Sequence, residues 1–320
     1  MKVPQLHVGA GSRLGPLGIF PVWTSGSGSL GISTGTHADV AVTELASGAQ
    51  VARLTVTNNG PHPALLLEGE LLEGGQQDRT CARDVVLGPG ETRDIDTFCV
   101  EAGRWEAGQS SHRRQARRAP LNVWSELANG PGERGGNRQG RIWERVSRFD
   151  NVRGASATSS LLQHMDRFRD DKEERNRFSA ADAPKPLEGQ RGVVIGLGQQ
   201  PLLLEVFGTN TLFRRHYRQL IDSALLDLEL LPPQALASGP MPGQRARDFA
   251  AHVQALDFGT FDDGAAAVEV RNHGTLRSRN VSRAAGSVSA AGIAVELPTR
   301  RPQLAHLTGW NTQHPLMEMA

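Results

Sequence analysis

The segment from Gly18 to Trp105 constrains the fold more than any other part of the chain. It holds four short apolar or alternating runs, GIFPVW, ADVAVTEL, VARLTVTN and ALLLEGELL, which are divided by Gly, Ser, Asn and Pro. Such runs are typical of β-strands, and the residues between them are typical of turns. No helical pattern lies between the runs, which favours an antiparallel sheet or sandwich over βαβ units.

Helical patterns follow in the second half of the chain. In residues 209–233 apolar side chains recur at i, i+3 and i+4, Thr209 or Asn210 can cap the start, and Pro232 ends the pattern. Further elements are predicted as helices over 156–178 and 243–256, a hairpin over 191–208, and strands over 265–272, 293–298 and 303–310. We therefore predict an α+β fold, in which several helices are attached to an antiparallel, β-rich, sandwich-like body.

Residues 106–140 fit neither pattern, because they are rich in Gly, Arg and Ser. A loop of this length inside a compact domain is either functional or mobile. The predicted organisation is an N-terminal β-rich part over 1–105, an Arg/Gly-rich loop over 106–140, and helices, a hairpin and C-terminal strands over 141–320. A chain of 320 residues can form one large core, so we expect the first and last parts to pack as one domain.

The predicted loop contains a basic cluster within the stretch SHRRQARR, formed by Arg113, Arg114, Arg117 and Arg118. The chain as a whole carries a net charge of only +1. A solvated loop is therefore favoured over a surface that contacts phosphate or nucleic acid, and we do not expect nucleic acid as a partner.

The N-terminal stretch MKVPQLHVGAGSRLG lacks the apolar core of a signal peptide, and no run of about 18 apolar residues occurs in the chain. The sequence therefore predicts a cytoplasmic protein without a membrane segment. Its ten histidines show no HExxH or other paired spacing, and no GxSxG or phosphate-loop motif occurs. We predict no metal site, and no motif indicates a cofactor.

The stretch from Gly74 to Trp105 has the pattern of a polar β-hairpin that turns at Gly88-Pro89-Gly90-Glu91. If Leu87 lies near Thr92 or Arg93, the most regular register places six side chains on one face. In that register the facing pairs are Arg79 with Glu101, Cys81 with Cys99, and Arg83 with Thr97.

The two cysteines of this hairpin are expected to be free thiols that act as small core residues. Directly opposed Cβ atoms in a sheet lie about 4.5–5.5 Å apart, farther than the ~3.8 Å that is usual across a disulfide. Two cysteines also do not form a disulfide framework. A redox pair, or a role in metal binding or catalysis, remains an alternative for Cys81 and Cys99.

Polar residues gather at the two ends of the hairpin, which must lie close in space. Arg79 and Arg104 can hold a phosphate or carboxylate, and Trp105 can stack on a ring. The candidate ligand-binding residues are Gln76, Gln77, Arg79, Arg104 and Trp105, and the candidate catalytic bases or ribose-binding groups are Glu70 and Glu101. The alternative is a structural network in which Arg–Glu pairs and glutamines satisfy the ends of the strands.

Two segments resemble the ARG-and-Rhodanese-Phosphatase-superfamily-associated protein domain family. They are LLLEGELLEGGQQDRT, which leads into the hairpin, and FCVEAGRW, at its end. Two further segments are similar to the family's later blocks: QGRIWERVSRFDNVRGASATSSL and LLLEVFGTNTLFRRHYRQLIDSAL. The resemblance extends from about Gly18 to Trp310. The matching motif positions are Glu70, Gln76, Gln77, Arg79, Cys99, Glu101, Arg104 and Trp105. This chain has Asp78 where the family pattern has Asn, and its Arg/Gly-rich stretch after Trp105 is longer.

The resemblance implies a role near ADP-ribose or NAD-derived metabolites, because the family is named for its genomic association with ADP-ribosylglycohydrolases. We therefore expect a small-molecule ligand-binding or sensor protein that takes a phosphorylated nucleotide or an ADP-ribose-like ligand. Two alternatives remain open: a hydrolase or transferase acting on such a ligand at the same residues, and a structural, partner-binding protein. The sequence does not determine the ligand, the reaction or the oligomeric state.

Overall fold

The computed structural model describes residues 2–25, 30–105, 109–128, 137–171, 179–232, 234, 236, 239–259, 266–270, 274–296 and 302–318. The chain divides into two compact units. The first consists of Met1–Gly31, Ala180–Ile221 and Leu231–Ala320, and the second of Ile32–Ser179 and Asp222–Leu230. Both units combine antiparallel sheet with helices, which confirms the α+β class. The units do not divide at the predicted boundaries, and packing as one domain stays a prediction.

The first unit is built on a nine-stranded sheet in the order β1-β3-β13-β14-β18-β17-β16-β15, with β2 paired to β3. Its strands are β1 (Leu6–Val8), β2 (Ser12–Leu14), β3 (Leu17–Thr24), β13 (Gly192–Leu197), β14 (Gln200–Phe207), β15 (Ala266–Val270), β16 (Gly274–Ala285), β17 (Val288–Glu296) and β18 (Gln303–Asn311). Its helices are η2 (Ala180–Asp182), α7 (Gly243–Gln254), α8 (Pro315–Glu318) and the first part of α5 (Asn210–Leu228).

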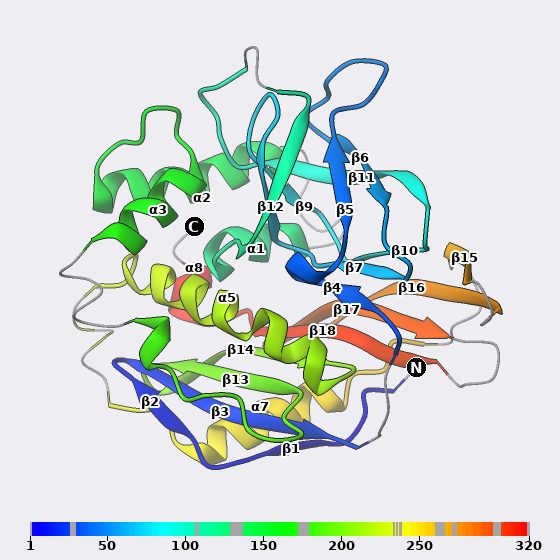
Figure 1. Cartoon of the computed structure of the whole chain (residues 1–320). Helices are drawn as coiled ribbons and strands as arrows, with labels where there is room; N and C mark the ends of the chain where they lie inside the picture. Colours follow the sequence, from blue (N-terminus) through cyan, green and yellow to red (C-terminus); the bar gives the residue numbers. More distant parts are fainter. Residues whose placement is uncertain are drawn as a thin grey trace. The chain divides into compact units, whose positions relative to one another are not determined.

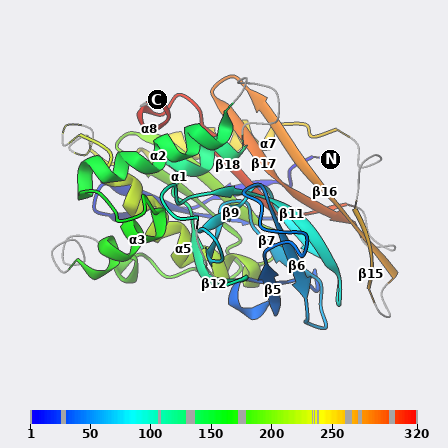
Figure 2. The same cartoon turned by 90° about the horizontal axis from the view of Figure 1, so that it is seen from above.

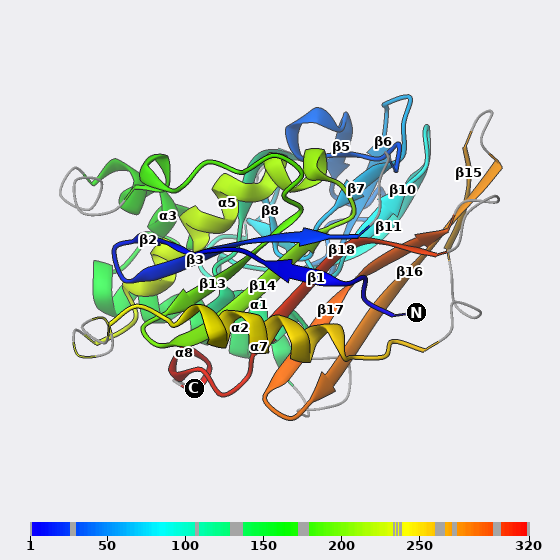
Figure 3. The same cartoon turned by 90° about the horizontal axis from the view of Figure 1, so that it is seen from below.

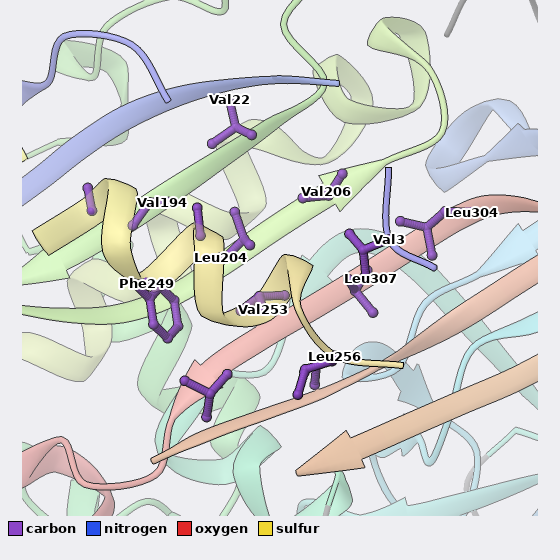
Figure 4. Packing of buried hydrophobic residues seen from close by; sticks show 14 of the residues in the cluster. Val3, Val22, Val194, Leu204, Val206, Phe249, Val253, Leu256, Leu304 and Leu307 are labelled. Carbon is purple, nitrogen blue, oxygen red and sulfur yellow. The ribbon is translucent and has the colours of Figure 1, made fainter. Parts of the chain in front are cut away.

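The two faces of this sheet are covered by different helices (Figures 1 and 3). On one face, Phe249 and Val253 of α7 pack among Val194 and Leu204 of the sheet (Figure 4). On the other face, Phe207 of β14 contacts side chains of α5, including Phe213. Successive residues of a strand point to opposite faces, so β14 contributes to both layers.

The second unit contains a closed barrel in the order β11-β6-β5-β12-β8-β9 and a three-stranded sheet in the order β10-β7-β4. Its strands are β4 (Ser33–Thr34), β5 (Val40–Thr43), β6 (Arg53–Asn58), β7 (Ala64–Leu66), β8 (Glu70–Gly74), β9 (Arg79–Cys81), β10 (Val85–Leu87), β11 (Thr92–Cys99) and β12 (Ser111–Arg118). Its helices are η1 (Gly35–His37), α1 (Leu121–Ala128), α2 (Arg138–Arg153) and α3 (Leu161–Asp170), with the end of α5. Figure 2 shows α1, α2 and α3 beside the strands of the barrel.

One long strand, β11, closes the barrel by pairing with two different partners. Its first half pairs with β6, from Thr92 opposite Thr57 onward, and its second half pairs with β9, where Cys99 lies opposite Arg79. Alternate residues of the barrel strands, among them Leu54 and Leu72, form a buried apolar cluster. The apolar cluster therefore holds the strands whose ends carry the polar residues described below.

The predicted register of the 79–101 hairpin is wrong by two residues. Arg79 faces Cys99 rather than Glu101, and Cys81 faces Thr97 rather than Cys99. The turn at Gly88–Glu91 does form, with a backbone hydrogen bond of 3.1 Å between its ends. The strand that precedes the turn, however, is β10, which leaves the barrel to pair with β7. Because β9 and β11 are not directly joined by that turn, the turn does not determine their register.

The prediction of a loop over 106–140 is wrong for the described part of that stretch, which forms β12 and α1; residues 106–108 and 129–136 lie outside the described residues. The basic cluster is correspondingly not a solvated loop. Arg114 pairs with Glu70, Arg117 with Asp166, and Arg118 donates to the Glu68 carbonyl. Carboxylates and carbonyls from other segments offset the positive charges, and this is why an arginine-rich segment lies in a barrel.

Most other predicted elements are confirmed. The helices α3, α5 and α7, the β13–β14 hairpin and the late strands β15, β17 and β18 lie within or beside their predicted ranges. Parts of four predictions, at 172–178, 233, 265 with 271–272, and 297–298, lie outside the described residues. Among the helices that the structure describes, none has both the length and the apolar character needed to cross a membrane.

Candidate functional site

Polar side chains from distant parts of the sequence gather at one end of the barrel. At this end β8 finishes at Gly74 opposite His112 of β12, and β9 begins at Arg79 opposite Cys99 of β11. Strand β5 finishes at the same end, where the Glu44 amide donates to the carbonyl of Ser110 beside β12. We call this region the Arg79 end; it comprises Glu44, residues 74–79, residues 99–105 and His112.

Arg79 is the most unusual residue of this region, because its side chain is fully buried at 0% exposure. Its only hydrogen bond within the described structure runs from Nη1 to Oε1 of Gln77, at 3.2 Å. The buried Nε and Nη2 atoms have no hydrogen-bond partner among the described residues. Burial lowers the pKa of Arg79, and nearby carboxylates oppose the effect. Buried polar groups are nearly always hydrogen-bonded, so these two donors require an explanation.

Trp105 lies next to Arg79 and is the exposed part of the region. Its ring centroid is 5.7 Å from the guanidinium carbon of Arg79, a cation–π distance. The side chain is 48% exposed, which is unusual for a large hydrophobic residue here. Gln77 is buried, and besides accepting from Arg79 it donates from Nε2 to the carbonyl of Glu101 at 2.8 Å. Gln77, Arg79 and Trp105 are thus brought together, as the sequence predicts.

Glu101 and Arg104 form a saturated ion pair. Oε1 of Glu101 accepts from Arg104 Nε and from the Thr158 hydroxyl, and Oε2 accepts from Arg104 Nη2 and from the Asp78 amide. Burial alone raises the pKa of Glu101, but the hydrogen bonds from Arg104 and Thr158 hold it below its ordinary value. A carboxylate with four donors is a weak base, so its contacts support an anchoring role.

Arg104 binds the ends of the strands together. Besides Glu101, it donates from Nη1 to the carbonyl of Gly75 at 2.9 Å and from Nη2 to Asp78 at 3.4 Å. Each of its three nitrogen atoms therefore already has a partner in the protein. Arg79, in contrast, keeps two donors without partners, which makes Arg79 the better candidate to contact a ligand.

Asp78 is a carboxyl of this region whose pKa is shifted toward neutrality. Burial raises its pKa to about 6, and the neighbouring Glu101 charge adds to the rise. Its Oδ2 accepts from the hydroxyl of Ser160, the residue that caps α3, at 2.9 Å. The preceding residue, Ser159, has φ of 51°, a strained conformation for a residue with a side chain. The loop before α3 is thus fixed against the barrel by Asp78 and Glu101.

Glu44 and His112 complete the region, and sequence reasoning did not identify either of them. Oε1 of Glu44 accepts from the Gln76 amide at 2.9 Å and lies 3.2 Å from Nε2 of His112. A Cβ atom at Gly75 would clash with Nε2 of His112 and lie 2.7 Å from Oε1 of Glu44, and φ at Gly75 is +54°. The only local signal is the glycine pair Gly74-Gly75, which marks a close backbone approach.

Two predicted site residues lie away from the Arg79 end. Glu70 stands at the opposite end of β8, where its Oε1 binds Arg114 at 2.8 Å. Cys81 is two residues beyond Arg79 along β9. Cys81 and Cys99 are both free and buried, and burial raises the pKa of each thiol. The catalytic assignment of Glu70 and Glu101 stays a prediction.

Within the described part of the chain, no group of three or more His, Cys, Asp or Glu side chains is arranged to hold a metal ion. The family model described as ARG and Rhodanese-Phosphatase-superfamily-associated Protein domain matches residues 5–310, a range that includes the whole Arg79 end. Searches among curated proteins and among solved structures found no match.

Proposed function

We propose that this chain, which belongs to the ARG and Rhodanese-Phosphatase-superfamily-associated Protein domain family, binds a small anionic metabolite at the Arg79 end of its barrel. The observation that carries this proposal is the buried guanidinium of Arg79, whose Nε and Nη2 donors have no partner among the described residues. Nε and one Nη of a guanidinium point the same way and match two oxygens of a phosphate or carboxylate.

Trp105 supports a ligand that has a planar ring beside its anionic group. Its indole is half-exposed and in contact with the fully buried guanidinium of Arg79, so a ligand of Arg79 would enter beside the indole. Aromatic side chains with one accessible face commonly stack on the rings of ligands. We therefore place the ligand among phosphorylated nucleotides and ADP-ribose- or NAD-derived compounds, a choice that also follows the family's association with ADP-ribosylglycohydrolases.

The remaining polar residues of the Arg79 end hold Arg79 and Trp105 in place. Gln77 bonds Arg79 and the carbonyl of Glu101, and Arg104 fixes Glu101, the start of the segment that leads to Trp105. A binding or sensing role needs no further chemistry from these groups. The hydrolase or transferase alternative needs a free base, whereas the Glu101 carboxylate already accepts four hydrogen bonds.

The test is calorimetric titration of the full chain with ADP-ribose, NAD, AMP and inorganic phosphate. The variants are Arg79→Met, which removes both donors, and Arg113→Met, a control with the same loss of charge at an exposed position of β12. We expect a ligand of this class to bind wild type and the control equally, and Arg79→Met to lose it. At about one hundred times its dissociation constant such a ligand stabilises the protein by about 2.7 kcal/mol, a shift of a few degrees in Tm.

Two results would contradict the proposal. One is the absence of binding by all four compounds, and the other is binding that Arg79→Met leaves unchanged. Chromatography of the incubated ligand then separates binding from catalysis, because a binding protein returns the ligand intact. Turnover that is lost in Glu101→Gln would instead establish the enzyme alternative.

A further inference from the structure

A second residue of the Arg79 end, Glu44, has a buried polar atom without a hydrogen-bond partner in the described part of the chain. Its Oε1 has two partners, the Gln76 amide and Nε2 of His112, and the latter must therefore be the protonated ring nitrogen. Burial lowers the pKa of His112, which favours the neutral ring, and the charge of Glu44 opposes this effect. The other carboxylate oxygen, Oε2, is buried and has no hydrogen-bond partner among the described residues.

Glu44 and Arg79 thus carry opposite charges at the same end of one barrel, and each side chain has buried hydrogen-bonding atoms without a partner among the described residues. Burial lowers the pKa of Arg79, and the charge of Glu44 is among the effects that oppose it. The part of the chain that the structure describes nevertheless contains no direct ion pair between them. A buried charge that lacks partners is costly. A ligand that reaches both side chains would supply the missing partners.

The backbone around Glu44 is shaped for this arrangement. Gly75 lies so close to His112 and Glu44 that any side chain would displace them, and a Cβ atom added at Gly74 would lie 3.1 Å from the carbonyl oxygen of Ser111. Both glycines have positive φ, which other residues adopt at a cost. The carboxylate of Glu44 is therefore held by an amide, an imidazole and a glycine turn rather than by an arginine or lysine.

We propose, as an extension that rests on the proposed function, that Arg79 and Glu44 together recognise an anion that carries a hydroxyl group on a neighbouring carbon. Nε and Nη2 of Arg79 donate to two oxygens of the phosphate or carboxylate, and Oε2 of Glu44 accepts from the hydroxyl. Sugar phosphates and hydroxy acids share this chemistry. Alkyl phosphates and simple carboxylates without the hydroxyl lack the second contact.

The test uses matched pairs of probes in calorimetric titrations of the full chain. The phosphate pair is 2-hydroxypropyl phosphate and propyl phosphate, and the carboxylate pair is lactate and propionate. The two pairs decide which anion the region takes. We expect the hydroxylated member of the bound pair to bind about tenfold more tightly, since a hydrogen bond to a charged group contributes at least this factor.

Glu44→Gln should abolish the difference within the pair while propyl phosphate or propionate still binds. Asp94→Asn is the control, because it removes one carboxylate from an exposed position of β11 in the same barrel. The comparison of probes in wild type does not depend on how well any variant folds. His112→Asn should reduce the difference in part, because it removes the ring that orients Glu44.

The outcomes separate this inference from the proposed function. If both members of a pair bind equally and Arg79→Met abolishes both, Glu44 does not contact the ligand, and only this inference fails. If none of the four probes binds, this inference fails, and the titrations with ADP-ribose, NAD, AMP and phosphate decide the proposed function separately. If Arg79→Met leaves the binding of a probe unchanged, anion binding by Arg79 fails as well. Alanine, which carries an ammonium group in place of the hydroxyl of lactate, is titrated as a fifth probe. If alanine binds more tightly than lactate, Glu44 recognises an ammonium group, which overturns the assignment to a hydroxyl.

Discussion

The guanidinium carbon of Arg79 lies 5.7 Å from the centroid of the Trp105 ring, so a fully buried cation is in contact with one of the most exposed aromatic side chains of the described structure. A cation–π contact of this kind contributes about 0.5–2 kcal/mol. It does not satisfy the N–H groups in the guanidinium plane. The contact with Trp105 therefore stabilises the protein moderately and leaves Nε and Nη2 of Arg79 without hydrogen-bond partners among the described residues.

Arg79→Met is expected to change the stability of the protein little. Replacing a buried charge with an apolar side chain of similar length removes a desolvation cost, which offsets the loss of the hydrogen bond to Gln77 and of the cation–π contact with Trp105. Urea unfolding measures the free energy of unfolding, which should fall by no more than about 1 kcal/mol. A loss of about 3 kcal/mol or more would mean that Arg79 is a structural residue and would support the scaffold alternative.

Glu101→Ala is expected to destabilise the protein by about 3 kcal/mol, because it leaves Arg104, the Thr158 hydroxyl and the Asp78 amide without their common acceptor. The same urea unfolding experiment measures this loss. The double variant with Arg104→Met should be less destabilised than the sum of the two single variants, since both remove one interaction. Strict additivity, or a loss below about 1 kcal/mol in Glu101→Ala, would contradict the network described here.

Asp78 should make stability depend on pH. Its pKa rises from 3.8 to about 6 on folding, so the folded state binds the proton more tightly than the unfolded state. The resulting stabilisation is fully present below about pH 4 and is lost as the pH rises through 6. A shift of this size corresponds to about 3 kcal/mol at most.

The measurement compares wild type with Asp78→Asn by urea unfolding at several values between pH 4 and pH 7.5. Wild type should lose stability relative to the variant as the pH rises. Other groups with shifted pKa, such as Asp227 and His314, titrate in both proteins and cancel in the difference. A difference that stays constant, or that grows in favour of wild type, would show that Asp78 is not protonated on folding.

Cys81 and Cys99 should be unreactive in the folded protein. Both thiols are buried, and burial raises the pKa of each, so the reactive thiolate is scarce. Ellman's reagent should label neither cysteine in native protein and both in denaturant, with or without prior reduction. Rapid labelling of the native protein, or two thiols that appear only after reduction, would restore the redox alternative.

Several features of this fold follow from local sequence patterns. The strands β3, β5, β6 and β8 match short alternating runs, α5 matches a repeat of apolar side chains between a cap and a proline, and the turn at Gly88–Glu91 forms where the glycines and proline predict it. These elements depend on residues that are neighbours along the chain. The convergence of Gln77, Arg79, Glu101, Arg104 and Trp105 was predicted for the same reason, because a chain reversal brings its two ends together.

The sequence-based predictions were wrong where a strand could pair with more than one other strand. The register of β9 against β11 differs by two residues from the prediction because β10 leaves to pair with β7, and β6 occupies the first half of β11. The basic segment 111–118 became a strand because Glu70 and Asp166, from distant segments, pair with two of its arginines. Neither partner is marked by any pattern near the arginines.

The sequence by itself determined the family, the α+β class and the position of most strands and helices, because apolar periodicity and turn residues act over short distances. The tertiary structure alone decided that Arg79 is buried without a carboxylate partner and that Glu44 meets His112, 68 residues away. Closing a barrel brings together strand ends that are far apart along the chain. The chemistry of the Arg79 end therefore depends on which strands became neighbours.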